Sequence, residues 1–278
     1  MRLIRNLIFF SSTTLLLLSC GNESKTTAEG RQAKAPARLI EETASYAADS
    51  LTMQGFVAYS DSFEGKRPAV LVVHEWWGLN DYAKNRVREL ARLGYVALAV
   101  DMFGNGQTAD NPQQAMQLAG PFYENLPMAK RRFDAGLARL KAHPQVDTSK
   151  IAAIGYCFGG FIALNAAKQG TELDGVVSFH GSLGGVTPDK NLLKAKILVC
   201  HGAADGMVPE QEVAMFKKQM DSIGADYTFK AYPDSKHAFT NPNATEKGKK
   251  FNIDIAYNAE ADKNSWNDMK DFFGKIFQ

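Results

Sequence analysis

The chain is best understood from the segment Ile151-Ala152-Ala153-Ile154-Gly155-Tyr156-Cys157-Phe158-Gly159-Gly160. Its short apolar run, followed by small and apolar residues up to position 168, predicts a buried strand that leads into a helix. Cys157 stands at the junction, with Gly155 two residues before it and Gly159 two residues after it. This spacing is typical of a nucleophile elbow, a turn so tight that both flanking positions must be nearly free of side chain.

Such a turn gives Cys157 the position of a nucleophile. Its sulfur would project above the sheet at a helix N-terminus, where the helix dipole favours a thiolate. The backbone N–H of Phe158 would then point toward the oxyanion that develops during attack on a carbonyl. The alternative is a structural cysteine, because free cysteine is often a small buried apolar residue. Cys200 lies within an apolar run without flanking glycines, and we expect it to be such a core residue.

Strand and helix patterns alternate on both sides of this turn. Apolar runs that predict strands lie at residues 69–73, 95–100, 151–154, 176–179, 197–200 and 227–232. Amphipathic or apolar helical patterns lie at residues 81–93, 128–141, 159–168, 210–223 and 266–277. This alternation predicts an α/β fold, a mostly parallel central sheet with helices on both faces. Ligands of such sheets bind at the carboxyl ends of the strands, so the residues that follow each strand are the candidates for function.

A thiol nucleophile needs a base, and the base needs an orienting acid. Enzymes with this elbow carry them in the chain order nucleophile, acid, histidine. Asp205 follows one predicted strand and His237 follows the last one, so both can converge on Cys157. The alternative for Asp205 is an N-cap of the helix that begins near residue 210.

The remaining histidines have weaker claims to the role of base. His143 precedes Pro144 away from any strand end, and we expect it at the surface. His74, His180 and His201 also follow strands and are expected to pack or to line the pocket, with His180 as an additional substrate contact. No group of residues has zinc-ligand spacing, so we expect neither a metal nor a cofactor.

Four segments together resemble the dienelactone hydrolase family of α/β-hydrolases, over residues 50–278. They are His74-Glu75-Trp76-Trp77-Gly78-Leu79-Asn80, Gly155-Tyr156-Cys157-Phe158-Gly159-Gly160, His201-Gly202-Ala203-Ala204-Asp205-Gly206-Met207-Val208-Pro209 and His237-Ala238-Phe239.

The resemblance implies an α/β-hydrolase fold and a triad of Cys157, His237 and Asp205. It also implies that Glu75 interacts with the resting thiol and changes partner when substrate arrives. The second N–H of the oxyanion hole would be that of Trp76. The alternative for Glu75 is a buried acid paired with a structural partner.

The chain departs from the family pattern where dienelactone-cleaving members hold the substrate carboxylate with arginines. The matching positions are Asn105 and Asn241, which cannot supply a charged fork. As substrate-binding residues they favour a neutral ester or lactone, with Trp76 and Trp77 as an apolar or carbohydrate-stacking wall. Residues 104–127 and 240–264 are expected to be long connections that cap the site and set specificity.

The N-terminal residues have the pattern of a signal peptide. Residues 1–19 have a positive and then an apolar region, and Leu17-Leu18-Ser19-Cys20 resembles the lipobox of bacterial lipoproteins. The resemblance implies cleavage before Cys20, its lipidation, and a lipid-anchored protein in the bacterial cell envelope, on the periplasmic or cell-surface face. An ordinary secretory signal is the alternative. Residues 20–39 would be a flexible tether and residues 40–278 the hydrolase domain.

Composition narrows the possible partners. The chain has 278 residues with 32 basic and 30 acidic side chains, a nearly neutral balance that gives no reason to expect nucleic-acid binding. Its three cysteines are too few for a disulfide framework. We therefore expect a monomeric hydrolase that cleaves a small ester or lactone and meets a membrane only through its N-terminus. A thioesterase, acyl transferase or peptidase on the same fold, a thiol redox protein and a non-catalytic surface-tethered binding protein remain alternatives.

Overall fold

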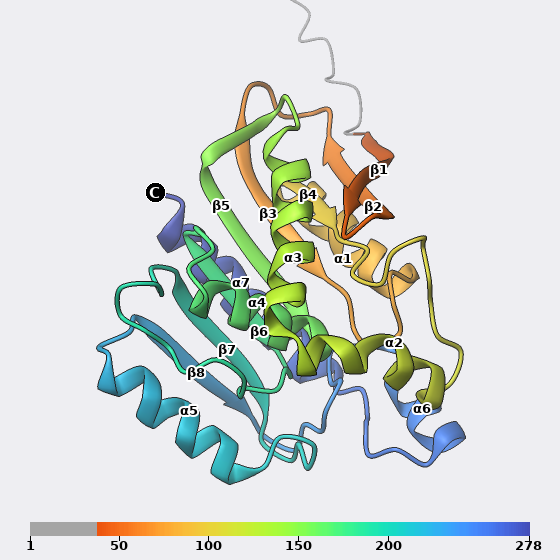
Figure 1. Cartoon of the computed structure of the whole chain (residues 1–278), viewed down its shortest axis with the longest axis vertical. Coiled ribbons are helices and arrows are strands. Elements are labelled where there is room, and N and C mark those ends of the chain that lie inside the picture. Colours follow the sequence, from red (N-terminus) through yellow and green to blue (C-terminus); the bar gives the residue numbers. More distant parts are fainter. Residues whose placement is uncertain (1–37) are drawn as a thin grey trace, which may run out of the picture. The chain divides into compact units, whose positions relative to one another are not determined.

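Eight strands within residues 38–278, the part of the chain that the computed structural model describes, form one sheet in the order β1-β2-β4-β3-β5-β6-β7-β8 (Figure 1). The strands are β1 Leu39–Ala48, β2 Leu51–Ser60, β3 Arg67–Val73, β4 Val96–Ala99, β5 Val146–Tyr156, β6 Gly175–Phe179, β7 Lys196–Gly202 and β8 Tyr227–Tyr232. From β4 to β8 along the sheet every neighbouring pair is parallel. The predicted α/β fold with a mostly parallel sheet is confirmed.

The hairpin of β1 and β2 was not expected from the sequence. These strands pair antiparallel with each other, and β2 pairs antiparallel with β4 at the edge of the sheet. Most β1 side chains are exposed or half-buried, so the strand lacks the continuous apolar run that marks the central strands.

Helices cover both faces of the sheet (Figure 1). They are α1 Asp81–Arg92, α2 Pro112–Glu124, α3 Leu126–Lys141, α4 Phe158–Lys168, α5 Glu210–Ser222, α6 Ala244–Phe251 and α7 Ala259–Ile276. Buried residues of α2, α3, α4 and α5 form a core with one face, and those of α1 and α7 form a core with the other.

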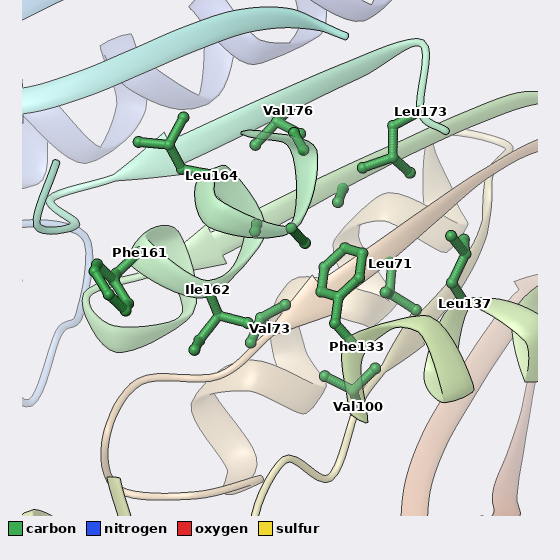
Figure 2. Close-up of a cluster of buried hydrophobic side chains, with 14 of the residues drawn as sticks. Leu71, Val73, Val100, Phe133, Leu137, Phe161, Ile162, Leu164, Leu173 and Val176 are labelled. Carbon is green, nitrogen blue, oxygen red and sulfur yellow. The ribbon is translucent and has the colours of Figure 1, made fainter. Parts of the chain in front are cut away.

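The central strand β3 shows why the sheet is buried on both sides. Leu71 and Val73 belong to the core under α3 and α4, whereas Val70 and Val72 belong to the core under α1 and α7. Successive side chains of a strand point to opposite faces, so a strand between two helix layers must be apolar throughout. Figure 2 shows Leu71 and Val73 beside Phe133 of α3 and Ile162 of α4.

The long connections expected at residues 104–127 and 240–264 contain helices. Asn111 accepts a hydrogen bond from the Gln114 N–H, and Pro112 occupies the first turn, so α2 has an ordinary helix start. Helix α6 lies in the second connection. Helix α7 begins at residue 259 rather than at the expected residue 266, because the side chain of its N-cap, Asn258, accepts a hydrogen bond from the Ala261 N–H. In the described residues no helix is long and apolar enough to cross a membrane.

Candidate active site

The turn around Cys157 has the geometry of a nucleophile elbow. Cys157 has φ 53° and ψ −116°, a backbone conformation that L-residues rarely adopt, and it directly precedes α4. A Cβ on Gly155 would lie 2.0 Å from the Gly159 carbonyl oxygen, and a Cβ on Gly159 would lie 2.2 Å from the Val73 carbonyl oxygen. Only glycine fits at either position, because the opposing atoms are backbone.

The acid and the base predicted from the sequence meet in the structure. His237 Nδ1 lies 2.9 Å from Asp205 Oδ2, and both side chains are buried. The other oxygen, Asp205 Oδ1, accepts a hydrogen bond from the Met207 N–H. Helix α5 has Pro209 at its N-cap, so Asp205 does not cap it and the alternative role for this acid is excluded.

The charge environment of His237 favours an imidazolium. Burial disfavours the charged ring, but Cys157 and Asp205 outweigh it and raise the pKa of His237 well above its ordinary value. Within residues 38–278 the buried Nε2 atom makes no hydrogen bond. The ring thus has one nitrogen engaged by Asp205 and one uncommitted beside Cys157, which suits proton transfer to and from sulfur.

Glu75 is buried in the same site, but its partner is not the thiol. Its Oε2 accepts a hydrogen bond of 2.6 Å from Asn241 Nδ2. Burial raises the pKa of Glu75, although the Asn241 amide and the charges of Lys247 and His237 oppose the shift. In the described residues no hydrogen bond joins Glu75 to Cys157. Asn241 therefore orients the acid and is not among the residues that line the cavity.

His180 lies behind Cys157 rather than in the substrate cavity. The Cys157 N–H donates to the Phe179 carbonyl at 3.0 Å and to His180 Nδ1 at 3.1 Å. Nδ1 must then be the unprotonated nitrogen, so Nε2–H is the donor to Thr240 Oγ1 at 2.7 Å. Burial and the charges of His237 and Arg86 lower the pKa of His180 well below its ordinary value. The expected substrate contact at this position is therefore a support for the elbow.

Thr240 connects this support to helix α1. Its hydroxyl also lies 2.6 Å from Tyr82 Oη, and its carbonyl accepts a 2.8 Å hydrogen bond from Arg86 Nη2. Arg86 is buried, is paired with Asp262 of α7, and lies over the Tyr82 ring. The turn that carries His237 and Asn241 is thus tied to two helices on one face of the sheet.

The other histidines have structural surroundings. Burial lowers the pKa of His74 to about 4, and its ring bridges the Glu75 carbonyl and the Met102 N–H. His201 packs against Phe229. His143 was expected at the surface, but it is buried and packs edge-on against Tyr59, because the strand hairpin that the sequence did not reveal covers it.

Two backbone N–H groups are available to an oxyanion. Neither Trp76 nor Phe158 donates its N–H to a backbone acceptor within residues 38–278. Phe158 begins α4, where the first N–H groups of a helix have no partner inside the helix. Trp76 follows the end of β3 by three residues and lines the cavity together with Cys157. The arrangement can hold a negative oxygen between the two amides.

The site opens into a cavity of about 130 Å³. Its lining is Glu75, Trp76, Trp77, Met116, Tyr123, Cys157, Ser182, Met207, His237, Ala238 and Ile255. Asn105, expected to bind substrate, is exposed and outside this lining, and its N–H bonds the Thr52 carbonyl of β2. The hairpin supplies that partner, so the position is fixed away from the cavity.

Sequence reasoning missed several cavity residues. Met116 and Tyr123 come from α2, and Met207 follows the predicted acid by two residues. The Asn111-Pro112 pair, an N-cap followed by proline, is the signal that could have revealed α2.

The two described cysteines differ in their surroundings. Burial raises the pKa of Cys200 to about 12, and this residue lies in the core, as expected. Cys157 is half-buried and lines the cavity. Cys20, the predicted lipidation site, lies outside the described residues. Among residues 38–278 no three His, Cys, Asp or Glu side chains form a metal-binding group.

A family model and several known proteins match this chain. The model of the family described as "Dienelactone hydrolase family" matches residues 53–277. A Yersinia pestis relative named "Putative carboxymethylenebutenolidase" is 26% identical over 234 residues, covering 80% of this chain and 83% of the relative. The crystal structure of a dienelactone hydrolase-like promiscuous phosphotriesterase, P91, from metagenomic libraries is 33% identical, with TM-score 0.81, covering 86% of this chain and 98% of that one. A structure titled m3DLH is 32% identical, with TM-score 0.82 and coverage of 86% and 99%.

Proposed function

Because the chain belongs to the dienelactone hydrolase family of hydrolases, we propose that it cleaves a neutral carboxylic ester or lactone with Cys157 as nucleophile. The observation that carries the proposal is the 2.9 Å contact of His237 with Asp205, with the second ring nitrogen uncommitted beside a cysteine in a strained elbow. A buried acid, a base and a nucleophile in this order form the catalytic arrangement of nucleophilic acyl transfer.

In the first half of the reaction, His237 Nε2 holds the proton of the Cys157 thiol while the sulfur bonds to the carbonyl carbon. The oxyanion accepts hydrogen bonds from the Trp76 and Phe158 N–H groups. The carbon–oxygen bond of the ester then breaks, and His237 donates its proton to the leaving alkoxide. Asp205 holds the imidazolium in place and stabilises its charge.

In the second half, water attacks the thioester carbon and gives a proton to His237. The carbon–sulfur bond breaks, the carboxylic acid leaves, and the proton stays on His237 beside the freed Cys157 sulfur, as at the start. Every step uses side chains and backbone groups of this chain, and none of the steps calls for a metal or a cofactor.

The preference for a neutral substrate is supported by the charges around the cavity. The lining contains no lysine or arginine, and its acid, Glu75, is hydrogen-bonded to an amide rather than to a cation. A substrate carboxylate away from the reacting carbonyl would have to give up its water with no lysine or arginine in the lining to pair with, which is unfavourable. Neutral esters and lactones avoid that penalty.

The cellular location of the protein is a second part of the proposal. We propose cleavage before Cys20 and lipidation of this residue, so that a monomeric catalytic domain is tethered to a bacterial envelope membrane. Two acyl chains hold a protein at a bilayer because each buried methylene contributes about 0.8 kcal/mol. Substrate would then be a small molecule met outside the cytoplasm.

The decisive experiment compares hydrolysis of p-nitrophenyl acetate by the wild type, Cys157→Ala and Cys200→Ala. Removing a nucleophile should lower kcat/KM by at least about 10³-fold. Cys200→Ala is the matched control, because Cys200 is the other described cysteine and is buried in β7. Circular dichroism of each variant establishes that it is folded.

Equal activity of Cys157→Ala and wild type would show that the nucleophile is another residue. Folded but inactive wild type on acetate, propionate and butyrate esters would favour the alternative of a surface-tethered binding protein. Turnover of acyl-thioesters or peptides with a higher kcat/KM than esters would favour a thioesterase, acyl transferase or peptidase on the same site.

A further inference from the structure

Exposed large apolar side chains gather at the mouth of the cavity. The described residues include seven such side chains, and three of them line this one cavity: Met116, 54% exposed, Tyr123, 37% exposed, and Met207, 46% exposed. Single apolar side chains on a surface are ordinary, but a group of them around one opening marks a contact for something apolar.

These side chains come from two segments of the chain. Met116 and Tyr123 lie on α2, and Met207 lies on the loop that carries Asp205. The Met207 N–H donates a 2.9 Å hydrogen bond to Asp205 Oδ1, so the position of Met207 is fixed relative to the proposed triad. Tyr123 packs 4.7 Å from Phe161, centroid to centroid, which anchors that side of the mouth to α4.

The lysine beside Trp77 is not among the residues that line the cavity. Lys247 lies with Nζ 4.1 Å from the centroid of the Trp77 ring and lines a neighbouring depression with Asp110 and Glu246. Trp77 itself lines the cavity. A substrate group that leaves the cavity between α2 and the Asp205 loop therefore meets methionine and tyrosine side chains rather than a charged partner.

The size of the cavity decides how much of a substrate reaches the mouth. A space of about 130 Å³ holds the reacting carbonyl and a short chain beside Cys157. A chain that exceeds this space extends outward, and the exposed Met116 and Met207 are the lining residues available to contact it. Methionine side chains are flexible and polarizable, and they adapt to apolar ligands of irregular shape.

We infer that the substrates are esters with an extended apolar chain, whose carbonyl lies at Cys157 and whose chain leaves the cavity between Met116 and Met207. This inference rests on the proposed function, because it assigns the exposed mouth to the same ester substrate. The expected substrate is a neutral ester of a medium-length aliphatic acid or alcohol, rather than a compact lactone.

The first test measures kcat/KM for p-nitrophenyl acetate, butyrate, hexanoate and octanoate. Each methylene that leaves water for the mouth should raise kcat/KM by about twofold to fourfold. In the double variant Met116→Ser, Met207→Ser, the octanoate-to-acetate ratio should fall by about tenfold. Met215→Ser is the matched control, because Met215 is also 54% exposed but lies on α5 outside the cavity lining.

The second test needs no turnover. Cys157→Ala is titrated with 2-alkanones of four to ten carbons, and binding is followed by the fluorescence of Trp76 and Trp77, which line the cavity. Kd should fall by about twofold to fourfold per methylene. The same double methionine variant on the Cys157→Ala background should flatten this dependence, whereas Met215→Ser should not.

The outcomes separate the two proposals. Hydrolysis through Cys157 with no dependence on chain length would overturn the inference and leave the proposed function in place. Chain-length-dependent ketone binding without hydrolysis of any ester would support the apolar mouth and overturn the proposed function. An effect of Met215→Ser as large as that of the double variant would also overturn the inference.

Discussion

Thr240 shows how a residue outside the cavity can position the proposed nucleophile, Cys157. Its hydroxyl is the acceptor for His180 Nε2–H, and this contact leaves His180 Nδ1 free to accept the Cys157 N–H. The chain of contacts holds Cys157 in a conformation with φ 53°. Such strain persists only where the surroundings enforce it. Thr240 is thus a positioning residue rather than a catalytic one.

We expect Thr240→Val to lower kcat about tenfold to a hundredfold with little change in KM. Valine keeps the shape but removes the hydroxyl, which leaves His180 Nε2–H buried without a partner at a cost of about 1–3 kcal/mol. Exchange of the imidazole proton to Nδ1 would relieve this penalty and remove the acceptor of the Cys157 N–H. Steady-state kinetics on an ester series measure the split between kcat and KM.

Thr240→Ser is the matched control, because serine restores the hydroxyl and should recover most of kcat. A merely structural role would make both variants lose stability without separating their kcat values. Equal kcat for the valine and serine variants, both folded by circular dichroism, would therefore exclude the positioning role.

At the scale of elements, the short distance between α4 and β3 depends on a glycine, Gly159. Gly159 lies at the start of α4, where a Cβ would lie 2.2 Å from the Val73 carbonyl oxygen of β3. Side chains under the helix can adjust, but two backbone segments cannot separate without moving a helix away from its core. The close packing of α4 against β3 seen in Figure 2 therefore depends on this residue.

Gly159→Ala should lower the free energy of unfolding by about 3 kcal/mol or more, because the overpacked atoms are backbone. Gly274→Ala offers the matched control, since nothing lies within 4 Å of a Cβ at this exposed position on α7. Alanine there should stabilise the helix by about 0.5–1 kcal/mol. Urea unfolding followed by circular dichroism measures both, and equal effects of the two substitutions would refute the packing argument.

At the scale of the whole molecule, a buried lysine makes the stability of the folded protein depend on pH. Lys168 at the end of α4 donates to the Leu183 carbonyl at 3.0 Å, in the loop that also brings Ser182 to the cavity. Burial lowers the pKa of Lys168 from 10.5 to about 8, although Glu212 opposes the shift. Between about pH 8 and 10.5 the unfolded chain therefore holds a proton at this position that the folded chain has lost.

Stability rises with pH wherever the unfolded state binds more protons, so the contribution of Lys168 increases between about pH 8 and 10.5. The penalty of burying the charge, about 3 kcal/mol, is fully present below pH 8. We expect the stability of Lys168→Met relative to wild type to fall by up to that amount between pH 7.5 and 10, measured by urea unfolding.

Lys218→Met, at an exposed position of α5, is the control for the general effect of alkaline pH. Its stability relative to wild type should stay constant across the same range. A constant difference for Lys168→Met as well would show that Lys168 keeps its proton in the folded protein up to pH 10.

Local signals in the sequence were sufficient for the central sheet and for the elbow. Buried strands are continuous apolar runs, and the glycines around Cys157 are required by contacts within one turn, so both are visible in short segments. The pairing of His237 with Asp205 followed from chain order and strand ends, because parallel strands deliver their carboxyl ends to one edge.

The surroundings of the site depended on residues that are distant in the chain. His180 was expected to contact substrate and instead supports Cys157, because Thr240, 60 positions away, captures its second nitrogen. Asn105 was expected in the cavity, yet the β1–β2 hairpin holds it outside.

The amino-acid sequence alone therefore determined the α/β sheet, the elbow and the candidate triad, because each depends on local geometry or on the common direction of parallel strands. Only the tertiary structure decided which side chains face the cavity, that Glu75 is bound by Asn241, and that Met116 and Met207 frame the mouth. These contacts arise where α2 and the loops after the strands pack together, and no spacing along the chain encodes such packing.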